Sequence, residues 1–195
     1  MRTVTRFRAS VLLLSALGAA WLLRSAEASA PIAVRAGVLI SGATPHQLEL
    51  AKWAVRRFEA AGLHPPSIEI EFHRDPSGCA GHMGLATKGH VDICTTLVNA
   101  MSRRVLLHEL GHLWLDQNVG ADVRARFLQV RGLRSWNASS DPWELRGYEQ
   151  GAEIISWVIG ERILSAQIPD NDPSALDAAF EILTGIPSRD SLPGA

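Results

Sequence analysis

Apolar and polar positions along the chain follow two different periods. Residues 68–72 (IEIEF) alternate strictly, which predicts a half-buried strand with one apolar face. Short apolar, β-branched runs at 37–41 and 91–96 predict two further strands. The stretch 73–90, between the predicted strands 68–72 and 91–96, is rich in glycine, histidine and turn-forming residues, so it predicts a long loop.

Helical spacing dominates much of the remaining chain. Thr44-Pro45 and Asp141-Pro142 each place a capping residue before a proline, which is a typical helix start. The segment 99–117 is apolar on most sides, so we expect a helix buried in the middle of the domain. The predicted helices cover 45–61, 99–117, 121–130, 141–164 and 174–183.

The N-terminus has the layout of a secretory signal peptide. Three arginines lie in residues 1–8, a nearly continuous apolar run covers 11–23, and small residues surround Ala28. We expect cleavage after Ala28, a single domain over 29–195, and a secreted or periplasmic (extracytoplasmic) protein with no membrane attachment after cleavage. An uncleaved anchor is the alternative, but the apolar run is shorter than the ~20 residues that span a bilayer.

Composition narrows the classes of function and redox environment. The chain is 47% hydrophobic with a formal net charge of -1, so nucleic-acid binding has no electrostatic support. Its two cysteines, Cys79 and Cys94, follow the predicted leader, and one disulfide is the natural interpretation in an exported protein. They could instead bind a metal, although their spacing matches no CxxC pattern. The sequence carries no signal for an oligomeric state.

The predicted central helix contains an HExxH motif, residues 108–112 (HELGH). His108 and His112 lie four residues apart, so both reach the same helical face and one tetrahedral ion. Glu109 projects in a neighbouring direction and could act on a metal-activated water as a general base. The alternative is a buried, hydrogen-bonded group without metal, but burying three polar side chains on an apolar helix is costly unless a cation pairs them.

A catalytic zinc site needs a third protein ligand, and the helix predicted after Asp141 carries two acids one turn apart in residues 149–153 (EQGAE). Together with HELGH, this pattern resembles the gluzincin branch of the zincin metallopeptidases. The resemblance implies that Glu149 is the third zinc ligand and that Glu153 orients a histidine, with the reversed assignment left open. Asp116 is a further candidate, either as a residue behind the metal ligands or as a ligand itself.

The resemblance also implies a fold and an activity. We expect a small α+β, zincin-like metallopeptidase core with a short mixed sheet, an active-site helix and a C-terminal glutamate helix. Zn²⁺ would be the cofactor and a peptide or protein the substrate, with strand 91–96 either at the edge beside the cleft or inside the sheet. A catalytically inactive zinc-binding protein and a zinc amidase acting on a non-protein amide are the alternatives. Candidate oxyanion stabilisers are His82, His90, Arg146 and Tyr148.

Overall fold

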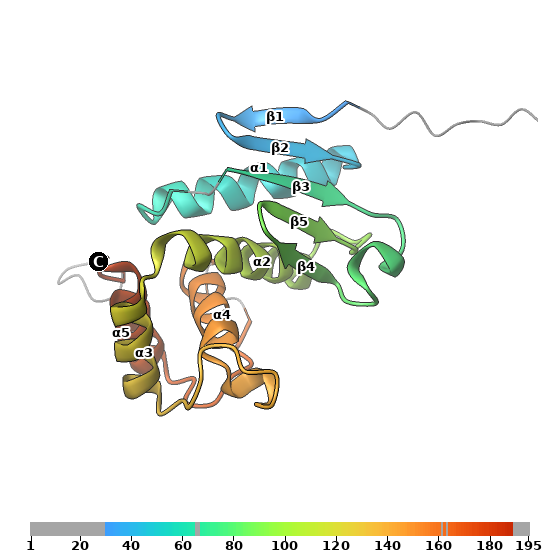
Figure 1. Ribbon diagram of the computed structural model, residues 1–195. Coiled ribbons are helices and arrows are strands. Elements are labelled where there is room, and N and C mark those ends of the chain that lie inside the picture. Colours follow the sequence, from blue (N-terminus) through green and yellow to red (C-terminus); the bar gives the residue numbers. More distant parts are fainter. Residues whose placement is uncertain (1–29, 65–66, 161, 163, 189–195) are drawn as a thin grey trace, which may run out of the picture.

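Five strands form one mixed sheet in the computed structural model, which describes residues 30–64, 67–160, 162 and 164–188 (Figure 1). The predicted signal peptide lies outside the described residues. The strands are β1 (Ile32–Arg35), β2 (Val38–Ser41), β3 (Ile68–Phe72), β4 (Gly84–Thr87) and β5 (His90–Ile93). Their order is β1-β2-β3-β5-β4, in which β2, β3 and β5 are parallel and the outer strands β1 and β4 are antiparallel to their neighbours.

Helices make up most of the rest of the described chain. They are α1 (Pro45–Ala60), α2 (Ala100–Asn118), α3 (Ala121–Arg131), α4 (Gly147–Ile159) and α5 (Pro173–Thr184), with single 3-10 turns η1 (Pro76–Cys79) and η2 (Trp143–Leu145). Figure 1 shows α3, α4 and α5 on the side of α2 away from α1. None of the described helices combines the length and apolar character needed to cross a membrane. Five helices and one mixed sheet in the described residues make the fold α+β, as predicted.

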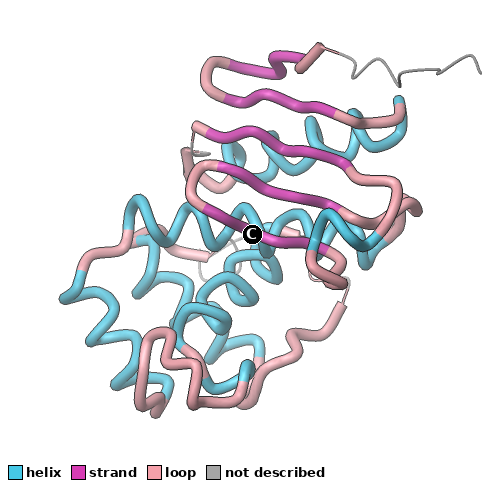
Figure 2. The backbone as a smooth tube through the Cα atoms, turned by 45° about the vertical axis from the view of Figure 1, so that its right-hand side comes forward, coloured by secondary structure: helices cyan, strands magenta, loops and turns pink. Residues whose placement is uncertain are grey.

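The strict alternation in β3 separates two faces of the sheet. Ile68, Ile70 and Phe72 are buried in a core shared with α1 and α2, whereas Glu69 and Glu71 stay partly exposed on the opposite face. The tube view in Figure 2 shows α1 behind the strands. One apolar cluster continues from this layer through α2 to α4 and α5. Helix α2 is thus surrounded by apolar neighbours, as its composition predicts.

Helices α2 and α4 approach each other closely at a glycine of the HELGH motif. A Cβ on Gly111 would lie 3.2 Å from the Cα of Ala152. Small residues at both positions allow the two backbones to pass near one another, which brings side chains of α4 next to those of α2.

The structure corrects the predicted start and end of α4. Instead of beginning at Asp141, the chain makes the η2 turn and is extended at Arg146, so the helix starts at Gly147. The first backbone N–H groups of α4 donate to the carbonyls of Ser135 and Trp136, at 3.0 and 2.7 Å, which replaces a capping side chain. At the other end, α4 stops at Ile159 rather than 164, with Gly160 as its C-cap.

The sequence did not predict strands β1 and β4, and it left open whether strand 91–96 lies at the edge or inside the sheet. Strand β1 and strand β4, which lies inside the predicted loop 73–90, form hairpins whose pairing with β2 and β5 compensates for weak local signals. Predicted strand 91–96 corresponds to β5, which is an interior strand, and β4 takes the edge. Cys79 and Cys94 form the predicted disulfide, with a Cα–Cα distance of 6.1 Å.

Candidate metal centre

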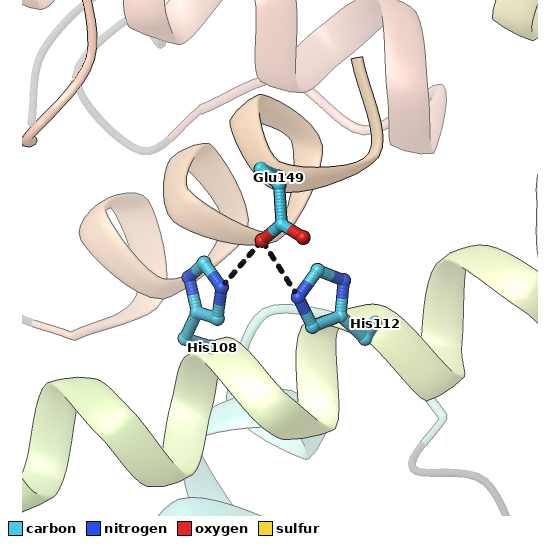
Figure 3. A group of neighbouring side chains, drawn as sticks. All are labelled: His108, His112 and Glu149. Atoms are coloured by element: carbon cyan, nitrogen blue, oxygen red, sulfur yellow. Dashed lines mark hydrogen bonds and ion pairs between the residues drawn. The ribbon is translucent and has the colours of Figure 1, made fainter. Parts of the chain in front are cut away.

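Three candidate ligands meet between α2 and α4. The Nε2 atoms of His108 and His112 lie 3.3 and 3.1 Å from Oε2 of Glu149, and the three ligand atoms all lie within 4.8 Å of one another. Figure 3 shows the two imidazoles rising from α2 towards the carboxylate at the start of α4. The structure therefore brings together the three residues that the resemblance to gluzincins implies as ligands.

Aromatic side chains hold both imidazole rings from the side. Trp143 stacks on His108 with ring centroids 5.8 Å apart, and Tyr148 stacks on His112 at 4.2 Å. Both aromatic residues belong to η2 or the first turn of α4, so the segment that delivers Glu149 also fixes the histidine orientations. No sequence signal indicates a part for Trp143 in the site, because a tryptophan near a helix start is most often a simple packing residue.

Glu153 binds the other nitrogen of His108. Its Oε2 lies 3.3 Å from His108 Nδ1, while its Oε1 accepts from Arg104 Nη2 at 2.6 Å and from the Gln167 backbone N–H at 2.8 Å. The carboxylate is fully buried, and its oxygens are not among the three converging ligand atoms. This geometry suits a carboxylate that orients a histidine ligand. The contacts therefore favour the prediction that Glu149, and not Glu153, is the third ligand.

Asp116 reaches the site through Tyr148. The tyrosine hydroxyl donates to Asp116 Oδ2 at 2.9 Å, with the backbone carbonyl of His112 at 3.4 Å. Nδ1 of His112 is buried and has no hydrogen-bond partner among the described residues. Asp116 therefore holds the Tyr148 ring that stacks on His112, and it does not contact a histidine nitrogen itself. The carboxylate that contacts a histidine Nδ1 is Glu153.

Glu109 lies beside the three ligand candidates, in the wall of a cleft of about 620 Å³. Residues 84–86 of edge strand β4 lie against Glu109 and line the same cleft, as do Tyr148 and Arg146. Burial raises the pKa of the Glu109 carboxyl. A carboxyl group with a raised pKa, next to a potential metal and open to a cleft, is suited to exchanging protons with a bound molecule.

Electrostatics at this position favour a cation. Burial lowers the pKa of His108, but hydrogen bonds to Glu149 and Glu153 outweigh it and raise the pKa to about 9. For the acid Glu149 the two effects have the opposite signs. Burial raises its pKa, but hydrogen bonds from both histidines outweigh burial and hold the pKa well below its usual range. The two carboxylates thus stabilise a positive charge, which either a proton on His108 or a metal ion supplies.

The spacing of the ligand atoms fits a metal ion. Two tetrahedral ligands about 2.0–2.1 Å from zinc lie roughly 3.3 Å apart. The observed separations of 3.3 and 3.1 Å from Glu149 Oε2 are close to this value, and the two imidazole nitrogens lie within 4.8 Å of each other. The group is therefore a candidate site for a divalent cation.

The candidate oxyanion stabilisers divide between two parts of the molecule. His82, Arg146 and Tyr148 line the cleft, whereas His90 contacts acidic side chains on the outer face of the sheet. Arg104, which sequence reasoning did not select, also lines the cleft and pairs with Glu153. Its position one helical turn before His108 was the available signal, but arginines on helices are usually solvated.

Comparison of the chain with protein-family models, curated proteins and solved structures returns no match. We therefore infer function from the residues and their geometry alone.

Proposed function

We propose that this protein is an exported zinc-dependent metallopeptidase with a zincin-like core. In this proposal His108, His112 and Glu149 hold Zn²⁺, and Glu109 is the general base. The observation that carries the proposal is the convergence of two imidazole nitrogens and one carboxylate oxygen within 4.8 Å of one another, in the wall of a cleft that Glu109 also lines.

The ligand set favours zinc over Ca²⁺ and Mg²⁺. Ca²⁺ and Mg²⁺ prefer oxygen ligands, whereas two imidazoles with one carboxylate are a typical catalytic zinc set. A structural zinc site uses four protein ligands, while a catalytic one uses three and keeps a position for water. Three converging protein ligands at an open cleft therefore support catalysis over a purely structural metal.

In this proposal Glu109 carries both proton transfers of amide hydrolysis. Zinc, when bound, supplies Lewis acidity and lowers the pKa of a coordinated water towards about 7. Glu109 accepts a proton from the attacking water and returns it to the leaving amine. Its raised pKa, caused by burial, brings the carboxyl nearer to the operating pH, which suits a group that must both take and give a proton.

Other residues hold the ligands in place. Glu153 accepts from Nδ1 of His108 and so leaves Nε2 free to face the metal position. Trp143 and Tyr148 restrict the rotation of the two imidazoles. Such preorganisation supports catalysis, because a ligand set that is already oriented needs no rearrangement when the cation binds.

Edge strand β4 supports a peptide or protein substrate. It pairs with β5 on one side and ends the strand order of the sheet, next to the metal position. An extended peptide can add to such an edge through main-chain hydrogen bonds, which places its amide groups along the cleft. The leader-like residues 1–28 and the disulfide of Cys79 with Cys94 support export.

Zinc content and peptide cleavage together test the proposal. We would measure zinc per chain by elemental analysis for wild type, His112→Ala, Glu149→Ala, Glu153→Ala and Glu109→Gln, and follow cleavage of a mixed peptide library by mass spectrometry. We expect one zinc ion fewer per chain in His112→Ala and in Glu149→Ala than in wild type. In Glu109→Gln we expect full zinc occupancy with activity reduced by roughly 100-fold or more.

The failing outcomes point to different functions. A zinc content that is the same in wild type and in His112→Ala would contradict the metallopeptidase proposal. Zinc binding with no cleavage of peptides, proteins or other amides would indicate an inactive binding protein. Cleavage of a non-protein amide that depends on Glu109, without any peptide cleavage, would indicate an amidase.

A further inference from the structure

A second group of histidines and acids lies on the outer face of the sheet, which is opposite the face covered by α1. Glu71 from β3 and His90 and Asp92 from β5 each offer one ligand atom, and these atoms lie within 4.8 Å of one another. The register places Glu71 directly across from Asp92, and Glu69 across from His90. The group comes from neighbouring parallel strands and shares no residue with the centre between α2 and α4.

The distances within this group also suit a metal ion. His90 Nε2 lies 3.1 Å from Asp92 Oδ1 and 3.7 Å from Glu71 Oε2. These separations bracket the roughly 3.3 Å expected between two tetrahedral ligands of one zinc ion. A small movement of the partly exposed Glu71 side chain brings its oxygen to the expected separation.

Charge favours a cation at this position. Glu69, Glu71 and Asp92 bring three carboxylates together, and within the described residues no lysine or arginine lies within ion-pair distance of them. Among the described residues, His73 and His90 are the ionisable partners of these acids, and the Ser41 hydroxyl donates to Glu69 Oε1 at 3.2 Å. Carboxylates facing each other across paired strands repel, so a divalent cation between Glu71 and Asp92 would remove a destabilising contact.

A further histidine holds Asp92 from the side. His73 Nε2 lies 2.6 Å from Asp92 Oδ1, and the His73 backbone N–H donates to the carbonyl of Ile93 at 2.8 Å. The imidazole fits against η1 because a Cβ on Gly78 would lie only 2.4 Å from the ring. The disulfide of Cys79 with Cys94 ties η1 to the residue after β5, so the position of His73 relative to Asp92 is fixed from two directions.

We propose that Glu71, His90 and Asp92 form a second binding site for a divalent transition-metal cation of the Zn²⁺ class. His73 positions Asp92 by hydrogen bonding. An imidazole ligand favours such a cation over Ca²⁺ and Mg²⁺. The bound ion links β3 to β5 and stabilises the folded sheet, because it binds the assembled strands and not the unfolded chain.

The test measures Zn²⁺ binding after removal of the first centre. In a His112→Ala/Glu149→Ala background without an affinity tag, isothermal titration calorimetry with Zn²⁺ is expected to show one ion per chain. Adding His90→Gln or Asp92→Asn to this background is expected to weaken binding at least tenfold. His73→Gln is expected to weaken it about 10- to 100-fold, because it removes an orienting partner. His46→Gln, at an exposed histidine outside both groups, is the matched control and should leave binding unchanged.

Two outcomes would overturn this second site. One is a background protein, folded by circular dichroism, that binds no Zn²⁺. The other is binding of equal affinity in the background and in its His90→Gln and Asp92→Asn derivatives. If the background does not fold, the count is made in otherwise wild-type protein, where two ions per chain should become one in His90→Gln. If only this second site is absent, wild type binds one ion and His90→Gln still binds one. If only the first centre is absent, wild type binds one ion and His90→Gln binds none, so failure of the metallopeptidase proposal is distinguishable from failure of this one.

Discussion

A side chain at Gly84 would collide with Glu109, because a Cβ built on this glycine lies 2.7 Å from Cγ and 2.8 Å from Oε1 of the glutamate. Val105 Cγ1 lies equally close, at 2.8 Å, so the new methyl group has no free direction. We predict that Gly84→Ala displaces the Glu109 carboxylate and reduces kcat for peptide cleavage by roughly 100-fold. Zinc content should stay at the wild-type value, since no ligand moves.

Gly120→Ala is the control for this prediction. Gly120 precedes α3, and a Cβ there meets no heavy atom within 4 Å. Its activity and zinc content should both match wild type. Full activity in Gly84→Ala would show that the strand yields without moving the glutamate, and that the contact is unimportant for catalysis.

Glu153→Gln separates an orienting carboxylate from a ligand. The substitution keeps the shape of the side chain but removes the charge that pairs with Arg104 inside the protein. We predict zinc affinity 10- to 100-fold weaker than wild type, whereas Glu149→Gln should lose zinc binding at this centre. The free energy of unfolding of metal-free Glu153→Gln should fall by about 3 kcal/mol, measured by urea denaturation.

An exposed acid provides the comparison for Glu153. Glu144 lies at the surface of the η2 turn, and Glu144→Gln should change neither zinc affinity nor stability. If Glu153→Gln abolishes zinc binding while Glu149→Gln retains it, the two glutamates have exchanged the roles assigned here.

The long periodic elements were predictable because their signals are local. Helices α1 and α2 begin with capping boxes at Thr44 and Asn99, and the alternation in β3 defines its buried face. Strand β4 carries no such pattern: its sequence GLAT is held by pairing with β5 and by the chain reversal at 88–89. Edge strands that depend on long-range pairing are invisible to local periodicity.

The candidate site was predictable to the same extent. The motif at 108–112 and the acids at 149 and 153 are sequence signals, so the three converging residues could be selected in advance. The stacking of Trp143 on His108 depends on the η2 turn, where the sequence favoured a continuous helix. The outer-face group needs the β3–β5 register, which brings Glu71 opposite Asp92 and which the sequence alone did not supply.

Gly111 tests the contact between the two helices that build the site. A Cβ at this position lies 3.2 Å from the Cα and 3.3 Å from the carbonyl oxygen of Ala152, both backbone atoms that cannot rotate away. We predict that Gly111→Val pushes α4 from α2, lowers the free energy of unfolding by about 1–3 kcal/mol and weakens zinc binding at least tenfold. Thermal unfolding of the metal-free protein and zinc titration check the two effects separately. Unchanged zinc affinity in a destabilised Gly111→Val protein would mean that the ligands adjust independently of the helix spacing.

The pKa of His108 predicts proton release when zinc binds. Burial lowers this pKa, but hydrogen bonds to Glu149 and Glu153 raise it to about 9, so the metal-free imidazole carries a proton at neutral pH. Burial lowers the pKa of His112, which is therefore already neutral. Because zinc binds only a neutral imidazole, binding at about pH 7 should expel about one proton from His108.

The affinity for zinc at this centre should consequently depend on pH in a defined direction. Between about pH 7 and pH 9 the association constant should rise roughly tenfold per pH unit, and above about pH 9 it should level off, because His108 has then lost its proton. Calorimetry in two buffers with different ionisation enthalpies counts the released protons. The starting protein is His90→Gln, so that zinc binding at the outer-face group does not contribute to the measured heat. In a Glu153→Gln derivative, which lacks one of the two hydrogen bonds that raise the pKa, fewer protons should be released at the same pH. No proton release in the starting protein at about pH 7 would mean that His108 is neutral before the metal binds. The hydrogen bonds to Glu149 and Glu153 would then not keep this imidazole protonated at neutral pH.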